Sequence, residues 1–368
     1  MRKIIAALTM LALSSTSALP QDANLSPPPE LTPAGARLVM SKVVDGFIRP
    51  GYRRFAETSG QLTSAMMQLC MAPSPEKLKA ARQAFATAAT DWARIEVVRV
   101  GPVIEKNRFE RILFYPDRKG TGLRQVQALI ANPDETATTP DGLSGKSVAM
   151  QGLGALEFVL HGSGSETLAT DANGFRCRYG LAVAGNVQKV ATELLQLWDN
   201  PDGIARDWKN PGPQSAVFRT PQEAMTEVLG ILVHAAEAVR DQRVESFYKG
   251  EANNTFPKQA LFWRAGLTFP MINGNLQGIK TLLDTSGLRD LLNADQQSII
   301  GSIDFVLTSL MRVSGTITPD VEAAVTDTTE RQKLDFVLLN SRDLILRLND
   351  SLGGGLGLGA GFSFSDGD

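Results

Sequence analysis

The 368-residue sequence is poor in the side chains that most protein metal sites use, with only two histidines and two cysteines. It contains no His-Glu-x-x-His zinc-protease pattern, no Gly-x-Ser-x-Gly nucleophile elbow and no phosphate-binding loop. A peptidase that uses a bound metal ion therefore lacks its usual ligands in this chain.

Basic charge and long apolar runs are scarce as well. The chain has 37 Lys and Arg residues against 39 Asp and Glu residues. Nucleic-acid binding requires a concentrated basic face, so we expect no nucleic-acid partner. No stretch reaches the roughly 20 apolar residues that span a bilayer. We therefore expect no transmembrane segment in the mature chain.

The N-terminus has the order of a secretory signal. Arg2 and Lys3 precede an apolar run from Ile4 to Leu13, and the small residues Thr16-Ser17-Ala18 follow. We predict a signal peptide over residues 1–18, without a following cysteine for lipidation, and a soluble periplasmic protein. Removing the two N-terminal basic residues lowers the basic count from 37 to 35, which leaves a formal net charge of −4.

The two cysteines, Cys70 and Cys177, both lie beyond the predicted signal peptide. An oxidising compartment would allow them to pair. They could equally be two separate buried thiols, and the sequence leaves both alternatives open.

Helical periodicity dominates the chain, whereas strand-like alternation is almost absent. A capping serine or threonine followed by proline begins three segments, at Ser74, Thr220 and Thr318. Thr220 and Glu223 also form a capping box. Apolar residues then recur in steps of three and four, which is the pattern of amphipathic helices. After Ser74 this stripe consists of Leu78, Ala81, Phe85, Ala88, Trp92 and Ile95. The sequence thus predicts an all-α protein.

The chain is longer than one hydrophobic core usually serves, so we expect two packed units. We predict a proline-rich arm over residues 19–33, a first helical bundle over 34–199, a linker over 200–219 and a second bundle over 220–352. Residues 353–368 form a glycine-rich C-terminal segment, whose glycines are expected to end the last helix in a loop.

Several motifs together resemble the imelysin-like family. The stretch GLGALE, from Gly152 to Glu157, is similar to the Gly-x-His-x-x-Glu motif of these exported, iron-linked bacterial proteins, which include imelysin and iron-regulated protein A-like chains and were once proposed to be metallopeptidases. The other similar segments, in order, are Trp92 to Pro102, Arg176 to Tyr179 with Trp198, Phe262-Trp263-Arg264, Asn275 to Gly278 and the terminal GFSFSDGD. The resemblance implies two related helical bundles, each like a four-helix bundle, packed side by side, and a docked C-terminal tail.

One residue departs from the family motif. A histidine and a glutamate three apart share one face of a helix, but this chain has Gly154 at the histidine position. Gly152 and Gly154 could instead permit a close helix crossing or a kink. His161, four residues after Glu157, could replace the missing ligand or could cap the end of the helix.

The metal set that remains is Glu157 with His234 and Glu237, where the two bundles would meet. It would hold iron or another divalent metal ion as a cofactor. Against this, His234 and Glu237 could be a simple pair on their own helix.

A ligand site without a metal is the other possibility. Its candidate residues are Gly152, Gly154, Glu157, Arg99, Trp263 and Arg264. Arginines offer a planar fork for carboxylate or phosphate groups. Each arginine could equally be paired with an acid such as Glu96 or Asp117.

The resemblance and the signal peptide together predict a non-enzymatic periplasmic protein of iron or haem uptake. It would bind a metal, a chelate or a partner at the interface of its bundles, and that uptake partner would lie at a membrane. A metal-dependent hydrolase is the first alternative, disfavoured because Gly154 replaces the motif histidine. An interaction scaffold is the second.

Overall fold

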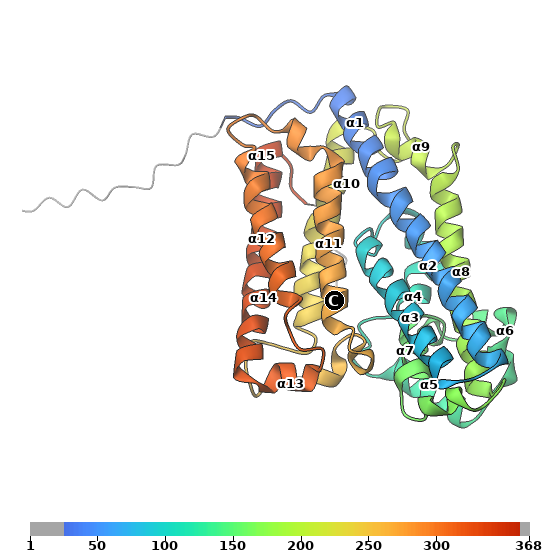
Figure 1. Cartoon of the computed structure of the whole chain (residues 1–368). Helices are drawn as coiled ribbons and strands as arrows, with labels where there is room; N and C mark the ends of the chain where they lie inside the picture. Colours follow the sequence, from blue (N-terminus) through green and yellow to red (C-terminus); the bar gives the residue numbers. More distant parts are fainter. Residues whose placement is uncertain (1–25, 361–368) are drawn as a thin grey trace, which may run out of the picture.

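The structure, a computed structural model, describes residues 26–360 and consists of helices joined by short connections (Figure 1). In this range there is no β-strand, and the extended pairing is limited to an isolated antiparallel bridge between Tyr248 and Thr255. The predicted all-α class is confirmed. The predicted signal peptide and the terminal GFSFSDGD lie outside the described residues.

None of the described helices combines the length and apolar character needed to cross a membrane. Some of the helices continue into π-helical segments, which are labelled η here together with the short 3-10 turns. The α-helices are α1 (Pro33–Val43), α2 (Arg49–Met71), α3 (Pro75–Ile95), α4 (Arg108–Ile112), α5 (Thr121–Ala131), α6 (Pro140–Ser144), α7 (Leu153–His161), α8 (Phe175–Asp199), α9 (Ile204–Lys209), α10 (Pro221–Ala238), α11 (Thr268–Ser286), α12 (Ser298–Ser314), α13 (Val321–Thr326), α14 (Thr328–Leu346) and α15 (Gly354–Leu356). The segments used below are η1 (Val44–Ile48), η7 (Val239–Val244), η9 (Trp263–Ala265) and η11 (Arg347–Gly353).

Two of the three predicted helix starts are confirmed. The side-chain oxygens of Ser74 and Thr220 each accept a hydrogen bond from the backbone N–H three residues later, at 3.2 and 3.1 Å. The third start is wrong by two residues, because Asp320 rather than Thr318 caps α13. The Asp320 carboxylate accepts two backbone N–H groups of the first turn, at 2.9 and 3.2 Å, which makes it a strong N-cap.

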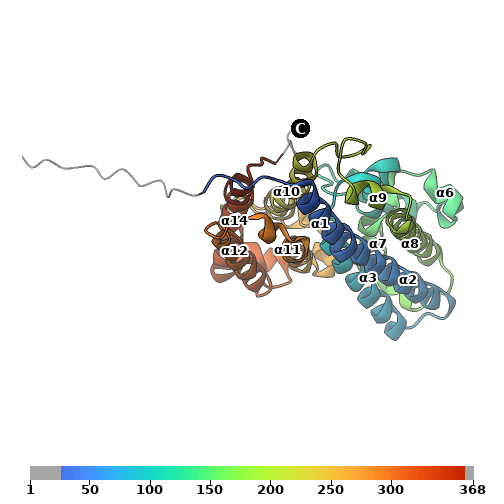
Figure 2. The ribbon, with the colours of Figure 1, turned by 90° about the horizontal axis from the view of Figure 1, so that it is seen from above.

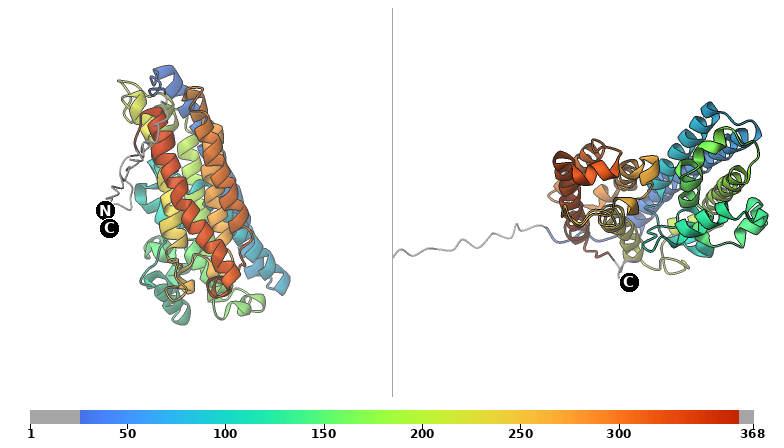
Figure 3. Two further views of the ribbon diagram at one scale, coloured as in Figure 1. Left: turned by 90° about the vertical axis from the view of Figure 1, so that its left-hand side faces the viewer. Right: turned by 90° about the horizontal axis from the view of Figure 1, so that it is seen from below.

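The long helices form two sets that lie side by side (Figure 1), an arrangement consistent with the two predicted bundles. The first set is built on α2, α3 and α8, with shorter helices around one end. The second set consists mainly of α10, α11, α12 and α14, which run nearly parallel when seen from the side (Figure 3). The two sets meet where α3 packs against α11.

The contact between α3 and α11 depends on the predicted family segment from Asn275 to Gly278. A Cβ at Gly278 would collide with the carbonyl group of Arg94, so only glycine permits this approach. The side-chain amide of Asn275 donates to the carbonyl oxygen of Ala93 at 2.8 Å. This segment therefore joins the two sets of helices.

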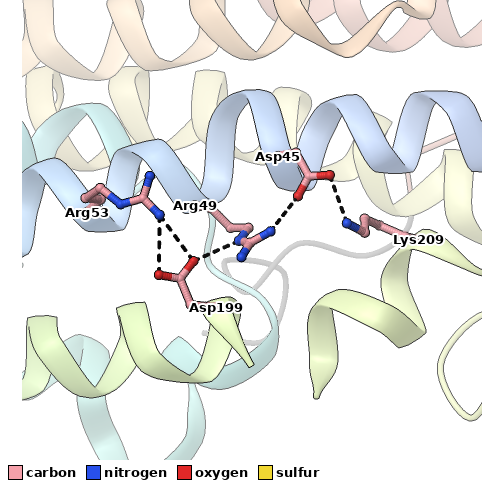
Figure 4. A network of polar contacts seen from close by, with 5 residues as sticks. All are labelled: Asp45, Arg49, Arg53, Asp199 and Lys209. Carbon is pink, nitrogen blue, oxygen red and sulfur yellow. Dashed lines mark hydrogen bonds and ion pairs between the residues drawn. The ribbon is translucent and has the colours of Figure 1, made fainter. Parts of the chain in front are cut away.

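One continuous helical rod, made of α1, η1 and α2, crosses both sets (Figure 2). Its second part packs on α3 and α8, whereas α1, which the sequence assigns to the first bundle, contacts α10 and α11 of the second set. A surface network ties the rod to α8 and α9 (Figure 4). Arg49 pairs with Asp199 at 2.8 Å and with Asp45 at 2.9 Å, and Asp45 also pairs with Lys209 at 2.8 Å.

The cysteines form a disulfide that joins the end of α2 to the start of α8. The Cα atoms of Cys70 and Cys177 are 5.5 Å apart, and both residues are buried. The two cysteines are therefore paired and are not separate buried thiols. The bridge closes a chain segment with a sequence separation of 107 residues.

The described part of the proline-rich arm, from residue 26 on, and the predicted linker both pack on the helices. In the proline-rich arm, the Ser26 N–H donates to the Asp295 carboxylate at 3.1 Å, and the Gln296 amide donates to the Ser26 carbonyl at 3.0 Å. The predicted linker contains α9, whose Trp208 packs edge-on against Trp198, with ring centroids 5.1 Å apart.

The glycine-rich C-terminal segment does not end the last helix where the sequence predicts. Helical conformation continues through η11 and α15, and the chain turns only at Gly357, where φ is 67°. The buried side chains of Leu352 and Leu356 explain this continuation, because their burial offsets the cost of glycine in a helix. A Cβ at Gly353 would lie 3.0 Å from Leu229, so glycine also allows the close packing here.

Candidate functional site

The GLGALE motif lies at the start of α7, and its first glycine has a packing role. Gly152 is the residue before the helix, with φ of −121°. A Cβ at this position would lie 2.8 Å from the carbonyl carbon of Ile112 and 2.9 Å from the carbonyl oxygen of Arg111. Gly152 therefore permits the backbone of α7 to approach that of α4.

The second glycine of the motif faces open space. A Cβ at Gly154 would have no heavy atom within 4 Å. Gly154 lines a cavity of about 310 Å³ between α5, α7 and the segment 258–264. The histidine of the family motif would extend into this cavity, so its replacement by glycine leaves the space for something else.

Glu157 lies one turn further along α7 and is 4% exposed. Arg264 donates hydrogen bonds to both carboxylate oxygens of Glu157. The backbone N–H of Arg264 donates to Oε1 at 3.1 Å, and the guanidinium Nη1 donates to Oε2 at 3.3 Å. Burial raises the pKa of Glu157, and the charge and hydrogen bonds of Arg264, together with the backbone of Ala265, oppose that rise.

A tight turn around η9 presents Arg264 to Glu157. The residues on either side of η9, Phe262 and Gly266, have φ of 54° and 67°. A positive φ is costly for phenylalanine. The Phe262 side chain is buried against Phe85, with ring centroids 5.3 Å apart, and this packing holds the turn in place.

Three of the residues that line the cavity are cationic. Arg118, Lys258 and Arg264 line it against two carboxylates, Asp117 and Glu157. Asp117 is engaged, because its oxygens accept two backbone N–H groups at the start of α5, at 2.8 and 3.2 Å. Arg118 is exposed and forms no ion pair within residues 26–360. The cavity is therefore suited to an anion.

An aromatic face completes the cavity. The guanidinium carbon of Arg264 lies 4.4 Å from the ring centroid of Trp263, and Lys258 Nζ lies 5.9 Å from the same centroid. Lys258 is mostly exposed and has a distant ion pair with Glu322 at 3.7 Å. The predicted residues Gly154, Glu157, Trp263 and Arg264 are thus brought together in one cavity.

Arg99 belongs to a neighbouring cavity instead. Its Nη1 donates to the side-chain oxygen of Gln242 at 3.0 Å, and its guanidinium carbon lies 4.7 Å from the ring centroid of Phe109. Neither Glu157 nor Arg264 lines the cavity that contains Arg99.

The structure does not bring Glu157, His234 and Glu237 together. His234 pairs with Glu237 on its own helix, with Nδ1 3.0 Å from Oε2, and neither residue lines the Glu157 cavity. Across residues 26–360, no group of three or more His, Cys, Asp or Glu side chains is placed to share a metal ion. At Glu157, the groups that hold the two oxygens are the backbone N–H and the guanidinium of Arg264.

His161 is the last residue of α7, but it does not cap the helix. Arg176 does so, donating to the carbonyl oxygens of Phe158 at 2.7 Å and Val159 at 2.9 Å. Arg82 donates to the carbonyl oxygen of Leu160 at 2.8 Å. An arginine reaches several carbonyls at once, so it displaces the histidine from this role.

Sequence reasoning missed the cavity residues Tyr115, Arg118 and Lys258, and it named Asp117 only as a possible partner of an arginine. Tyr115 bridges the two sets of helices, since its hydroxyl lies 2.8 Å from Ser246 Oγ and donates to the Gln259 carbonyl at 3.1 Å. The only local signal was the change from the apolar residues 113–115 to the polar run 117–120 after a proline. That pattern marks a turn but does not indicate what the turn faces.

Comparison with known proteins agrees with this architecture. The Imelysin family model, peptidase M75, matches residues 48–345. An imelysin-like protein from Psychrobacter arcticum 273-4 is structurally similar, with a TM-score of 0.73 and 18% identity over 91% of this chain and 99% of that chain. A protein from Parabacteroides distasonis ATCC 8503 described as an iron-regulated protein A precursor has a TM-score of 0.70 and 14% identity, over 88% of this chain and 96% of that chain. No curated protein matches the sequence. Because the family match extends over most of its length, this chain belongs to the imelysin family.

Proposed function

We propose that this is an exported, non-enzymatic protein of iron or haem uptake that binds a small organic anion, such as an iron chelate, in the cavity beside Glu157. The N-terminal signal pattern supports export. The iron link is supported by the similarity to a protein described as an iron-regulated protein A precursor.

The distribution of charge in the cavity carries the proposal. Both lining carboxylates already accept hydrogen bonds from the protein, whereas Arg118 and Lys258 remain available for a ligand. Trp263 supplies a flat apolar surface beside them. Pockets that bind small molecules combine apolar walls with a few polar groups that fix orientation, and here those groups favour negative charge.

The same residues do not fit a resident metal ion. A lone carboxylate binds a transition metal weakly unless other ligands join it, and the Glu157 carboxylate is held by Arg264. In this proposal, iron enters the cavity as part of its ligand and is not coordinated by Glu157, His234 or Glu237.

Calorimetric titration with ferric citrate, with citrate alone and with haemin tests the proposal. We expect saturable binding of at least one of these anions. Arg118→Gln and Lys258→Gln should each weaken it by about threefold to tenfold, since each removes one charged contact. Lys119→Gln is the matched control, because Lys119 is an exposed neighbour of Arg118 that does not line the cavity.

Three results would contradict the proposal. Equal weakening by Arg118→Gln and Lys119→Gln would indicate general charge attraction in place of a site. Absence of binding to all three probes would favour the interaction scaffold. Chelator-sensitive cleavage of a peptide by the purified protein would instead support a metal-dependent hydrolase.

A further inference from the structure

A second cavity, also about 310 Å³, shares the segment 113–115 as a wall with the cavity beside Glu157. It is lined by Arg99 and Gln242 and by the aromatic rings of Phe109, Phe114 and Tyr115. Since Glu157, Trp263 and Arg264 are not among its lining residues, it is a separate space.

Arg99 has no acidic partner in this cavity. Its one hydrogen bond is to the neutral amide of Gln242, at 3.0 Å, and it forms no ion pair within residues 26–360. The buried acid Glu96 favours the charged form of Arg99 but forms no ion pair with it, and its Oε2 is buried without a hydrogen-bond partner in the described chain. Its Oε1 accepts from Arg243 at 2.7 Å and from Asn275 at 2.6 Å. The Nε and Nη2 groups of Arg99 therefore remain available.

A second arginine, Arg243, lies beside this cavity, and its Nη2 is paired with the Glu96 carboxylate at 2.7 Å. Arg243 on η7 is 2% exposed, and its Nε and Nη1 are buried without a hydrogen-bond partner in the described chain. Its guanidinium carbon lies 4.9 Å from the ring centroid of Tyr115. Burial and the charge of Arg243 lower the pKa of Arg99 to about 10, so Arg99 remains protonated at neutral pH.

The cavity also has one acidic lining residue, Glu110. It is half-buried and does not form an ion pair with Arg99. Its charge favours the protonated form of Arg99, yet it would repel an anion at the same place. Removing the charge of Glu110 should therefore strengthen the binding of an anion and weaken the binding of a cation.

The walls select the rest of the ligand. The guanidinium of Arg99 lies over Phe109, with Cζ 4.7 Å from the ring centroid, so its orientation is fixed. An arginine fork binds carboxylates in a planar, two-pronged geometry. Phe114 and Tyr115 offer further aromatic surface for a flat ring.

From these contacts we propose that the Arg99 cavity binds a small aromatic carboxylate, as a second site beyond the one proposed beside Glu157. The carboxylate pairs with the free Nε and Nη2 groups of Arg99. The ring lies against the aromatic walls, and the lining residue Ile104 is 49% exposed.

Titration of the full chain with benzoate tests this site, with benzamide as the neutral probe of the same shape. We expect saturable benzoate binding below about 10 mM and binding of benzamide that is at least about tenfold weaker. Arg99→Gln should weaken benzoate binding about tenfold, with a folded protein confirmed by circular dichroism. Benzoate that fails to bind, or that binds equally well to the Arg99→Gln protein, would overturn the proposal.

Substitutions at Ile104 keep the test independent of any folding defect in Arg99→Gln. Because this side chain is exposed, Ile104→Glu should fold normally and weaken benzoate binding, whereas Ile104→Gln should change it little. Glu110→Gln should tighten binding. Lys258→Gln, which weakens the ligand of the first cavity, should have no effect on benzoate. If Lys258→Gln weakens benzoate and Ile104→Glu does not, the anion occupies the first cavity and the second site is rejected.

Discussion

Glu157 and Arg264, 107 residues apart in the sequence, form a two-point contact in which one residue satisfies both oxygens of a buried carboxylate. The backbone N–H of Arg264 contributes one bond and its guanidinium the other. The contact joins α7 of the first set of helices to the segment that precedes α11. The contact therefore stabilises the packing at the edge of the cavity. It also disfavours Glu157 as a metal ligand.

Replacing Arg264 should reveal the cost of this buried charge. Arg264→Gln leaves the Glu157 carboxylate without its counter-ion, and we expect a loss of about 3 kcal/mol in the free energy of unfolding at neutral pH. Burial already raises the pKa of Glu157, and loss of Arg264 raises it further. A raised pKa in the folded state means that folding takes up a proton, so the deficit should shrink as pH falls through that pKa.

Urea denaturation at about pH 7 and about pH 5 measures this change. The matched control is the double variant Glu157→Gln with Arg264→Gln, which carries no buried charge and should be more stable than Arg264→Gln alone at pH 7. A deficit of equal size at both pH values would show that the guanidinium acts through packing and not through its charge.

The two glycines of the GLGALE motif should respond oppositely to alanine. A Cβ at Gly152 meets the backbone of Arg111 and Ile112, which cannot move aside easily, so Gly152→Ala should cost about 1–3 kcal/mol. A Cβ at Gly154 meets nothing, so Gly154→Ala should change stability by no more than about 0.5 kcal/mol, in the stabilising direction. Thermal melting of the two proteins decides the point, and similar destabilisation by both would show that the cavity closes in solution.

The sequence predicts the helical class well because that class depends on local patterns. The stripe after Ser74 and the caps at Ser74 and Thr220 act within one or two turns, and the structure contains them as expected. The prediction from the C-terminal glycines is wrong because the end of the last helix depends on contacts that are not local. Their helical cost is local, whereas the burial of Leu352 and Leu356 that offsets it depends on other helices.

The candidate site was predictable only in part. Glu157 and Arg264 could be named from motifs, but their mutual pairing could not, since the pairing depends on a turn in which Phe262 adopts a positive φ. Arg99 seemed to belong to the same site, and only the position of the segment 113–115 separates it into a second cavity. Similarly, a histidine at a helix end suggests a cap, and Arg176 becomes visible as the actual cap only when α8 is placed beside α7.

The disulfide between Cys70 and Cys177 should contribute strongly to stability. It closes a loop with a separation of 107 residues, which corresponds to about 4–5 kcal/mol in the chain-entropy model. We expect reduction, or the double substitution Cys70→Ser with Cys177→Ser, to lower the melting temperature while the helical circular-dichroism signal persists at low temperature. Melting with and without a reducing agent measures the effect. The double variant serves as the control, because a reductant should not lower its melting temperature further.

His161 should make the protein sensitive to mild acid. Burial, with the nearby charge of Arg82, lowers its pKa from 6.5 to about 4. Between these values the unfolded chain binds a proton that the folded chain does not, so stability is full above about pH 6.5 and falls as pH falls towards 4, by about 2 kcal/mol. His161→Phe removes this titration and keeps an aromatic ring beside Phe85, whose centroid is 5.9 Å from that of the imidazole. Denaturant unfolding should be measured for both proteins from about pH 7.5 to about pH 4.5. As pH falls, the free energy of unfolding of the variant should increase relative to that of the native protein. Parallel curves would mean that His161 is protonated as readily in the folded protein as in the unfolded chain.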